Sequence, residues 1–402
     1  MTPIKIPQSR LSERRGQFFK ILTAEHELRH FIVLNPISIY YLTGFVLIPT
    51  ERPFFLICTN ITRNPSINFF VPELEKQHVQ EEVPFVEEVE SYFEYPGEVH
   101  PMTKFASFLK DKLRISGNIG AEGAGAPGKW GYIGPSFSDV LKFPVRIVSD
   151  IIANMRIIKD EDELASIRES AKWGNLAHRL LQDYTAVGEN EIDVSFRASH
   201  EASKRMREAL GPDYSPIGYG ARPCGAGYRG QIGPYSAIPH AMTRNAVFHK
   251  GDTLVTGAGG NVAGYLSELE RTMFMGEPNK KQKDYFDIMI RAQKAAFETL
   301  GPEVPLSKVD KATRAVFKDS GVLNLVQHHT GHALGLEGHE RPFLDLGMDE
   351  LLRPGMVFSV EPGIYDRSIG GFRHSDTIII TADGIEIITE YPRTLEELII
   401  YN

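Results

Sequence analysis

The sequence predicts two mixed domains, a smaller α/β domain over residues 1–150 and a larger α+β domain over residues 151–402. Two observations lead to this prediction. The first part of the chain alternates short apolar runs with helical patterns, which is typical of α/β order. After about residue 150 the helical and the strand-like segments fall into separate groups, which is typical of a sheet covered by helices. A length of 402 residues is ample for two such domains.

In the first domain, two apolar runs of strand length, residues 31–34 and 54–57, predict buried strands. Residues 118–122 predict the start of a further strand. Between these strands, residues 103–113 predict an amphipathic helix whose apolar face carries Phe105, Phe108, Leu109 and Leu113. Strands that alternate with helical segments in this way support the α/β prediction.

The second domain opens with a helix that begins near Lys159. Acidic residues crowd its first turn, where the positive end of the helix dipole favours them. Three more helices are predicted at about residues 191–210, 286–300 and 306–317. The predicted strands are residues 252–258, 264–274, 327–334, 356–365 and 372–381. Together they predict a curved sheet covered by helices.

Composition excludes several classes of protein. The chain has 44 basic and 52 acidic residues and a net charge of −8, so it is a poor candidate for binding nucleic acid. Cys58 and Cys224 have no CxxC spacing, which argues against a disulfide framework or a cysteine-built zinc site. We find no apolar signal segment or membrane span, because prolines, glycines and polar residues interrupt residues 31–49. A cytoplasmic protein without a nucleic-acid or membrane partner is expected.

Two carboxylates stand two residues apart in the predicted strand 264–274. Because residues two apart in a strand share a face, Glu268 and Glu270 should point the same way. The flanking segments are apolar and rich in glycine, which favours a buried position. Two buried carboxylates need a metal ion, a cationic partner or a proton. An ordinary exposed acidic face is the alternative.

Further candidate groups lie on segments far apart in the chain. His332 and His339 flank a glycine-rich turn, and Glu361 ends an apolar strand just before a Pro-Gly pair. His374 lies on the last long predicted strand, and His240 follows Pro239 in a loop. Taken singly, each residue is also compatible with a structural role as a turn cap, a strand-face residue or a loop histidine.

Taken together, these segments resemble the pita-bread family of prolidases, aminopeptidases P, methionine aminopeptidases and creatinase. The resemblance rests on an ordered set of motifs: Met155 to Lys159, Pro239-His240, Lys250-Gly251-Asp252, Gly264-Tyr265, Arg271-Thr272, Gly331-His332, His339-Glu340, Pro354-Gly355-Met356 and Glu361-Pro362-Gly363. It covers nearly all of the second domain and, more weakly, the first. It implies a pita-bread catalytic domain over residues 151–402 and a creatinase/prolidase-like N-terminal domain over residues 1–150.

Metallopeptidases of this family hold two metal ions with two Asp, one His and two Glu. Transferred by position, these ligands fall on Gly257, Glu268, His332, Glu361 and Ser375. Glycine offers no side-chain ligand and serine is a poor one for these metals. The resemblance therefore implies a site without metal or other cofactor. A single ion retained with the help of His339 or His374 is the alternative.

The site residues resemble most closely those of creatinase, the metal-free member of the family. This resemblance implies that His240 is the catalytic acid/base and that Glu270 and Glu361 are catalytic carboxylates. Arg52, just before Pro53, resembles the arginine that creatinase extends across its dimer to the substrate carboxylate. We therefore expect a homodimer in which Arg52 acts in trans. The remaining substrate-binding candidates are Glu268, His332, His339, His374 and Arg341.

The sequence thus favours a metal-independent, creatinase-like hydrolase of a non-peptide C–N bond. Without a metal, Glu270 and Glu361 would repel each other, and a cationic substrate group would relieve that repulsion. With Arg52 on the anionic end, a small zwitterionic amidine, guanidino or cyclic amide compound is expected. Two alternatives stay open: a metal-dependent Xaa-Pro peptidase with a rearranged site, and a non-catalytic pita-bread binding domain. Residues 212–233, rich in glycine and tyrosine, are a candidate lid.

Overall fold

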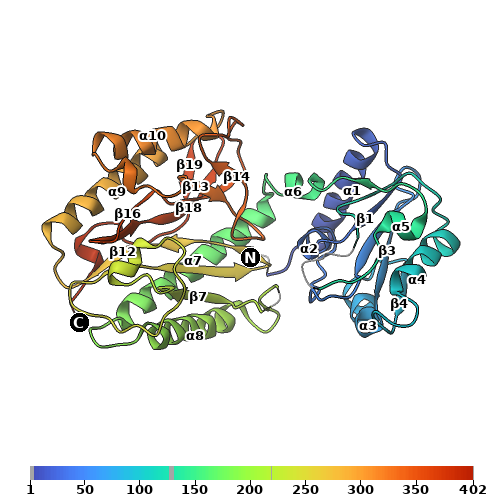
Figure 1. Ribbon diagram of the computed structural model, residues 1–402, viewed down its shortest axis with the longest axis horizontal. Helices are drawn as coiled ribbons and strands as arrows, with labels where there is room; N and C mark the ends of the chain where they lie inside the picture. Colours follow the sequence, from blue (N-terminus) through green and yellow to red (C-terminus); the bar gives the residue numbers. More distant parts are fainter. Residues whose placement is uncertain (1–3, 126–130, 219, 402) are drawn as a thin grey trace. The chain divides into compact units, whose positions relative to one another are not determined.

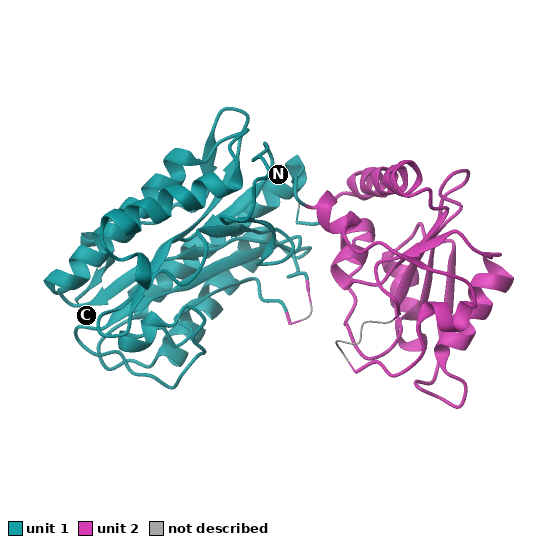
Figure 2. Ribbon diagram, turned by 45° about the horizontal axis from the view of Figure 1, so that its top comes forward, with its two compact units in different colours: residues 1–5, 157–217, 221–402 teal, residues 6–156, 218–220 magenta. Residues whose placement is uncertain are grey.

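The computed structural model describes residues 4–125, 131–218 and 220–401. The chain divides into two compact units, shown in two colours in Figure 2. Unit 1 comprises residues 1–5, 157–217 and 221–402, and unit 2 comprises residues 6–156 and 218–220. No helix of the described residues is long and apolar enough to cross a membrane.

Unit 2 is built on a six-stranded mixed sheet with the order β4-β3-β2-β1-β5-β6. Rings of Phe55, Phe105 and Phe137 pack with centroids 4.8 to 5.6 Å apart on this sheet and help to form its core. The elements are α1 (Gln8–Ala24), β1 (His30–Val33), α2 (Pro36–Thr43), β2 (Phe55–Thr59), β3 (Ser66–Pro72), α3 (Glu73–Glu82), β4 (Glu88–Tyr92), α4 (Pro101–Ser107), η1 (Phe108–Lys112), β5 (Ile119–Ala121), α5 (Phe137–Leu141), β6 (Arg146–Ile147) and α6 (Ile151–Met155).

Unit 1 contains a nine-stranded sheet with the order β10-β9-β11-β18-β15-β13-β14, to which β7 and β19 add. Smaller sheets are formed by β20-β12-β8 and β16-β17. Helices α7 and α8 pack on β9 and β7, and α9 and α10 form a second helical pair (Figure 1). The helices are α7 (Glu161–Tyr184), α8 (Glu191–Leu210), α9 (Lys280–Thr299) and α10 (Leu306–Asp319), with short turns η3 (Gly233–Ala237), η4 (Leu323–Leu325) and η5 (Glu396–Leu398).

The strands of unit 1 are short and mostly antiparallel. In chain order they are β7 (Cys224–Gly227), β8 (Thr253–Val255), β9 (Gly257–Val262), β10 (Tyr265–Leu266), β11 (Leu269–Glu270), β12 (Thr272–Met275), β13 (Gly331–Ala333), β14 (Glu340–Leu344), β15 (Val357–Val360), β16 (Gly363–Asp366), β17 (Gly370–Arg373), β18 (Ser375–Ile380), β19 (Ile385–Ile387) and β20 (Ile399–Ile400). The mixed composition of helix and sheet that the sequence predicts is confirmed in both units.

The helix predictions hold best where a cap marks the first turn. Asp160 caps α7, because its carboxylate accepts hydrogen bonds from the backbone N–H groups of Asp162 and Glu163 at 2.9 and 3.0 Å. Helix α9 begins at Lys280, earlier than predicted. Asn279 and Gln282 form a capping box there, a signal that the apolar pattern alone does not show.

Three long predicted strands are each broken in the structure. Residues 264–274 form β10, β11 and β12, because β11 pairs with β9 and β18 whereas β12 pairs with β8 and β20. Residues 356–365 divide into β15 and β16, and residues 372–381 continue from β17 into β18. The chain passes from one sheet to another after β11, β15 and β17, whereas β10 and β11 both lie in the nine-stranded sheet. Glu268 and Glu361 stand at two of these breaks, where the backbone turns their side chains toward a common space.

Part of the predicted lid, residues 212–233, is a strand. In β7, Cys224 pairs with Gly260 and Gly227 with Gly257 in antiparallel register on β9. The glycines of β9 permit a close approach of the backbone: a Cβ on Gly259 would lie 2.2 Å from the carbonyl oxygen of Ser267. This segment is therefore anchored to the sheet, and residue 219 within it lies outside the described residues.

Candidate functional site

Five of the polar residues singled out in the sequence meet on one part of the nine-stranded sheet. Glu270 ends β11, His332 lies in β13, and His339 directly precedes β14. Glu268 and Glu361 stand at strand breaks beside β11 and β15. Because β11, β15, β13 and β14 lie within one sheet, side chains from distant parts of the sequence come together. The two glutamates of the predicted strand 264–274 do point into the same space, although that strand is broken.

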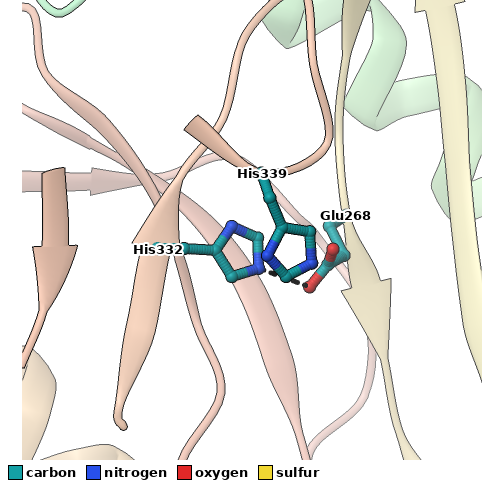
Figure 3. Close-up of side chains that lie close together, drawn as sticks. All are labelled: Glu268, His332 and His339. Carbon is teal, nitrogen blue, oxygen red and sulfur yellow. Dashed lines mark ion pairs between the residues drawn. The ribbon is translucent and has the colours of Figure 1, made fainter. Parts of the chain in front are cut away.

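His332 is the most enclosed of these groups, with 1% of its surface exposed. Its Nδ1 lies 3.1 Å from the carbonyl oxygen of Ala333, which fits a protonated Nδ1. Its Nε2 points into the cluster, 3.9 Å from Oε1 of Glu268 (Figure 3) and 3.3 Å from Oε1 of Glu361. Among the described residues this Nε2 has no hydrogen-bond partner. Burial lowers the pKa of His332, but the two carboxylates outweigh burial and raise it to about 9.

Glu268, His332 and His339 together could hold a metal ion. One ligand atom from each lies within 4.8 Å of the others (Figure 3). The two imidazole rings stack with centroids 3.7 Å apart. Ser359 and Ser375 donate hydrogen bonds to Oε1 of Glu268 at 2.6 and 2.9 Å, which fixes the carboxylate. Such outer contacts orient metal ligands in known sites.

Glu270 is held by two guanidinium groups. Arg373, with 3% of its side chain exposed, donates from Nε and Nη2 to both oxygens of Glu270, the latter bond at 2.8 Å. Arg229 donates from Nη2 to Oε1 at 2.7 Å. The Nε of Arg373 also lies 3.6 Å from Oε2 of Glu361. Burial lowers the pKa of Arg373, but the carboxylates of Glu270 and Glu361 raise it well above its ordinary range.

Glu361 lies between the histidine side of the cluster, at His332, and its arginine side, at Arg373. It contacts His332 through Oε1 and lies near Arg373 through Oε2. Burial raises the pKa of its carboxyl group, but the contact with His332 and the charge of Arg373 prevail and lower it to about 2. Glu361 is therefore ionised at neutral pH and can accept hydrogen bonds.

Gly257 and Ser375 stand where the resemblance would require metal ligands, and other groups fill these places. A Cβ on Gly257 would lie 3.5 Å from Oε1 of Glu270 and 3.9 Å from Nε of Arg229. The hydroxyl of Ser375 contacts the hydroxyl of Ser359 as well as Glu268. The residues present do not fit a five-ligand centre with two ions, but they fit one ion.

Two of the predicted substrate-binding residues lie outside the cluster. His374 is completely buried and packs edge-on against Phe286, with ring centroids 5.3 Å apart. Strand alternation turns it away from the face that carries Arg373 and Ser375. Arg341, at an exposed position of β14, lies 3.8 Å from Glu350. Neither residue is part of the metal-binding groups.

The loop histidine His240 is exposed. Its neighbour Pro239 accepts a hydrogen bond from Nη1 of Arg373 at 3.4 Å, which ties the loop to the cluster. The pKa of His339 is lowered first by burial and then by the charge of His332, with a further contribution from His240. His240 is thus within electrostatic reach of the site.

Arg52 belongs to unit 2. Its Nη1 forms an ion pair with Oε1 of Glu51 at 2.7 Å. Together with Leu47, Pro49 and Phe54 it lines a pocket of about 40 Å³ in that unit. The homodimer and the role of Arg52 in trans stay predictions of the sequence.

The buried His374 makes the stability of the protein sensitive to acid. Burial and the charges of Arg271 and Arg393 hold its pKa well below the ordinary value of 6.5, and neither ring nitrogen has a hydrogen-bond partner among the described residues. As the pH falls below 6.5, the unfolded chain gains a proton that the folded chain does not, so stability is lost. Between about pH 7 and pH 5, the free energy of unfolding should therefore fall less in His374→Leu than in wild type. The expected difference is about 1 kcal/mol or more.

Urea denaturation at a series of pH values checks this expectation. His200→Gln is the matched control, because His200 is exposed on α8 and should leave the pH dependence of wild type unchanged. Equal pH dependence in His374→Leu and wild type would contradict the assignment of a neutral, buried His374.

Sequence reasoning missed the two arginines. Arg373 had a usable signal, because a guanidinium two residues before Ser375 on a buried strand needs a carboxylate partner. No sequence signal pointed to Arg229, because it lies in a loop after β7 and its partner Glu270 is 41 positions away in the sequence. His328 and Tyr365 were also missed; they contact each other at 2.8 Å, and Arg373 donates to the hydroxyl of Tyr365 at 3.1 Å.

Known proteins resemble the chain over most of its length. It is 30% identical over 364 residues to the Xaa-Pro dipeptidase of Pyrococcus horikoshii, which covers 90% of this chain and 93% of that protein. It is 27% identical to the Xaa-Pro dipeptidase of Pyrococcus furiosus, over 96% of this chain and all of that protein. Among solved structures, the prolidase of Thermococcus sibiricus superposes with a TM-score of 0.80 at 24% identity and covers 97% of this chain and 98% of that chain.

These similarities correct the functional expectation. The expected metal-independent, creatinase-like hydrolase of a non-peptide C–N bond was wrong, because the matching relatives are named Xaa-Pro dipeptidases and the matching family is one of metallopeptidases. The expected amidinohydrolase or amidohydrolase type fails on the same ground. The broader statements stand: the pita-bread family and the two-domain fold are confirmed.

Two family models cover most of the sequence. Residues 15–130 match the creatinase/prolidase N-terminal domain. Residues 165–382, more than half of the chain, match metallopeptidase family M24. The chain therefore belongs to metallopeptidase family M24, a family of hydrolases, and carries a creatinase/prolidase N-terminal domain.

Proposed function

We propose that this protein hydrolyses the peptide bond of small Xaa-Pro peptides with one divalent metal ion. The observation that carries the proposal is the convergence of Glu268, His332 and His339 within 4.8 Å. One carboxylate oxygen and two imidazole nitrogens form a ligand set that manganese, cobalt and zinc accept. The substrate class is drawn from the names of the relatives, and the site residues are drawn from the geometry of this chain.

The donor set passes an independent test of fit. The Nε2 of His332 is buried, lacks a hydrogen-bond partner among the described residues, and points at the two carboxylates. In this chain the ion pair with Glu361 offsets the burial of that nitrogen, and a bound metal ion would take over that role. A divalent ion held there by Glu268, His332 and His339 supplies Lewis acidity and a water molecule of lowered pKa when bound.

The remaining residues act on the substrate. Glu361, 3.3 Å from His332 and 3.6 Å from Arg373, is placed to accept a hydrogen bond from the attacking water or from the substrate amine. The exposed His240 is the donor that we assign to the substrate carbonyl oxygen, which gains negative charge as the bond is attacked. The guanidinium of Arg373 lies near both carboxylates, so it offsets the repulsion between Glu270 and Glu361 and holds the two side chains in position.

Chelation tests the proposal directly. Protein stripped with EDTA and returned to metal-free buffer should not cleave Ala-Pro, and added Mn²⁺, Co²⁺ or Zn²⁺ should restore the activity. Ala-Ala at the same concentration is the matched control for the proline preference. Full activity in the stripped protein, or no cleavage of any Xaa-Pro dipeptide with any of the three ions, would overturn the proposed function.

A further inference from the structure

We propose that the guanidinium groups of Arg229 and Arg373 take the place of a second metal ion, so that each chain binds one divalent ion. The inference deepens the proposed function and rests on its single-ion site of Glu268, His332 and His339. It assigns to Arg229 and Arg373 a permanent charge-balancing role toward Glu270 and Glu361.

The space supports this arrangement. At Gly257, where the resemblance would require a carboxylate ligand, a Cβ would already lie 3.5 Å from Oε1 of Glu270 and 3.9 Å from Nε of Arg229. The glycine thus leaves room for the ion pair between Arg229 and Glu270, which spans 2.7 Å. A side chain long enough to bind a metal from position 257 would compete with that pair.

The charge balance of the cluster also favours a single metal ion. The carboxylates of Glu268, Glu270 and Glu361 outnumber the guanidiniums of Arg229 and Arg373 by one. With His332 neutral, as a metal ligand must be, one divalent ion brings the net charge of the cluster to +1. A second ion would leave three uncompensated positive charges in a largely buried cluster, at a large desolvation cost. Unlike a metal ion, a guanidinium neither dissociates nor loses its proton.

The backbone of Arg229 indicates that its position matters. Its φ is 53°, in the left-handed region that is unfavourable for a non-glycine residue. The tertiary structure holds this conformation, and the side chain it presents is the one that pairs with Glu270. Its side chain is nevertheless 47% exposed, so its removal should leave the core intact.

Metal titration of the full chain tests the inference without using activity. Metal-free wild type, titrated with Mn²⁺ by calorimetry, should bind about one equivalent. Arg229→Ala should bind that ion about tenfold more tightly, because it removes a positive charge near the ion. Arg229→Lys keeps the charge and should leave the Kd within about twofold. Arg205→Ala, on the exposed face of α8, is the matched control for loss of an arginine.

Three outcomes would overturn the inference: two equivalents in wild type, no binding, or an unchanged Kd in Arg229→Ala. The triple variant Gly257→Asp, Arg229→Ala, Ser375→Glu carries the test further and should bind about two equivalents. A folded triple variant that stays at one equivalent would count against the inference. Cleavage of Xaa-Pro dipeptides is measured in a separate assay. A metal stoichiometry other than one therefore overturns this inference without deciding whether the protein is an Xaa-Pro peptidase.

Discussion

His332→Ala is expected to lower the cleavage of an Xaa-Pro dipeptide by about 10³-fold, because metal-ion catalysis contributes several kcal/mol. The imidazole is the buried member of the proposed metal site, and its Nε2 faces both Glu268 and Glu361. Removing it leaves a carboxylate and one exposed histidine, too few ligands to hold an ion. Steady-state kinetics at saturating Mn²⁺, together with calorimetric Mn²⁺ titration, measure the two expected losses.

The control for this variant is another buried histidine of the same unit. His374→Leu alters a side chain that lies outside the cluster and should retain activity within about twofold. Circular dichroism should show that both variants fold. Wild-type kinetics in a folded His332→Ala would remove His332 from the site and, with it, the single-ion centre.

Arg373→Met is expected to lower the free energy of unfolding by about 3–5 kcal/mol at neutral pH, since it leaves buried carboxylates without their main partner. Arg373 bonds both oxygens of Glu270, lies near Glu361, and also donates to Pro239 and Tyr365. Of these contacts, the ones to Glu270 decide the size of the effect. Chemical denaturation of the metal-free protein measures it without interference from metal binding.

A double variant separates lost charge from lost packing. Arg373→Met combined with Glu270→Gln removes both members of the ion pair and should be more stable than Arg373→Met alone. In the single variant, the folded state favours a protonated Glu270, so the carboxyl pKa lies above that of the unfolded chain. Its deficit relative to wild type should therefore shrink as the pH falls from about 7.5 to 5. The loss of stability in Arg373→Met could instead be the same at every pH and in the presence of Glu270→Gln. That result would show that Arg373 stabilises the protein through packing only.

Local signals in the sequence account for much of the fold. The acidic first turn after Lys159 predicts the start of α7, and Asp160 forms the cap that this signal implies. The apolar run 31–34 corresponds to β1 (His30–Val33). These features depend on residues within a few positions of one another, so periodicity and capping rules can detect them.

Rules based on periodicity and capping do not detect strand breaks or glycine-rich strands. Half of the residues of strand β9 are glycine, and the strand has no apolar alternation. Its glycines let the backbones of Ser267 and Ser170 approach closely. The switch from β11 to β12 depends on which strands lie alongside: β11 pairs with β18, and β12 pairs with β8.

The order of the motifs along the chain was enough to indicate the family. It also identified the carboxylates and histidines that meet in the structure: Glu268, Glu270, His332, His339 and Glu361. The burial of His374 in the core and the pairing of Arg229 with Glu270 beside Gly257 emerge only in three dimensions. Both depend on contacts between residues that are distant in the sequence. Arg229, Glu270 and Arg373 lie on separate segments, and their charges balance only once β7, β11 and β17 have been assembled in three dimensions.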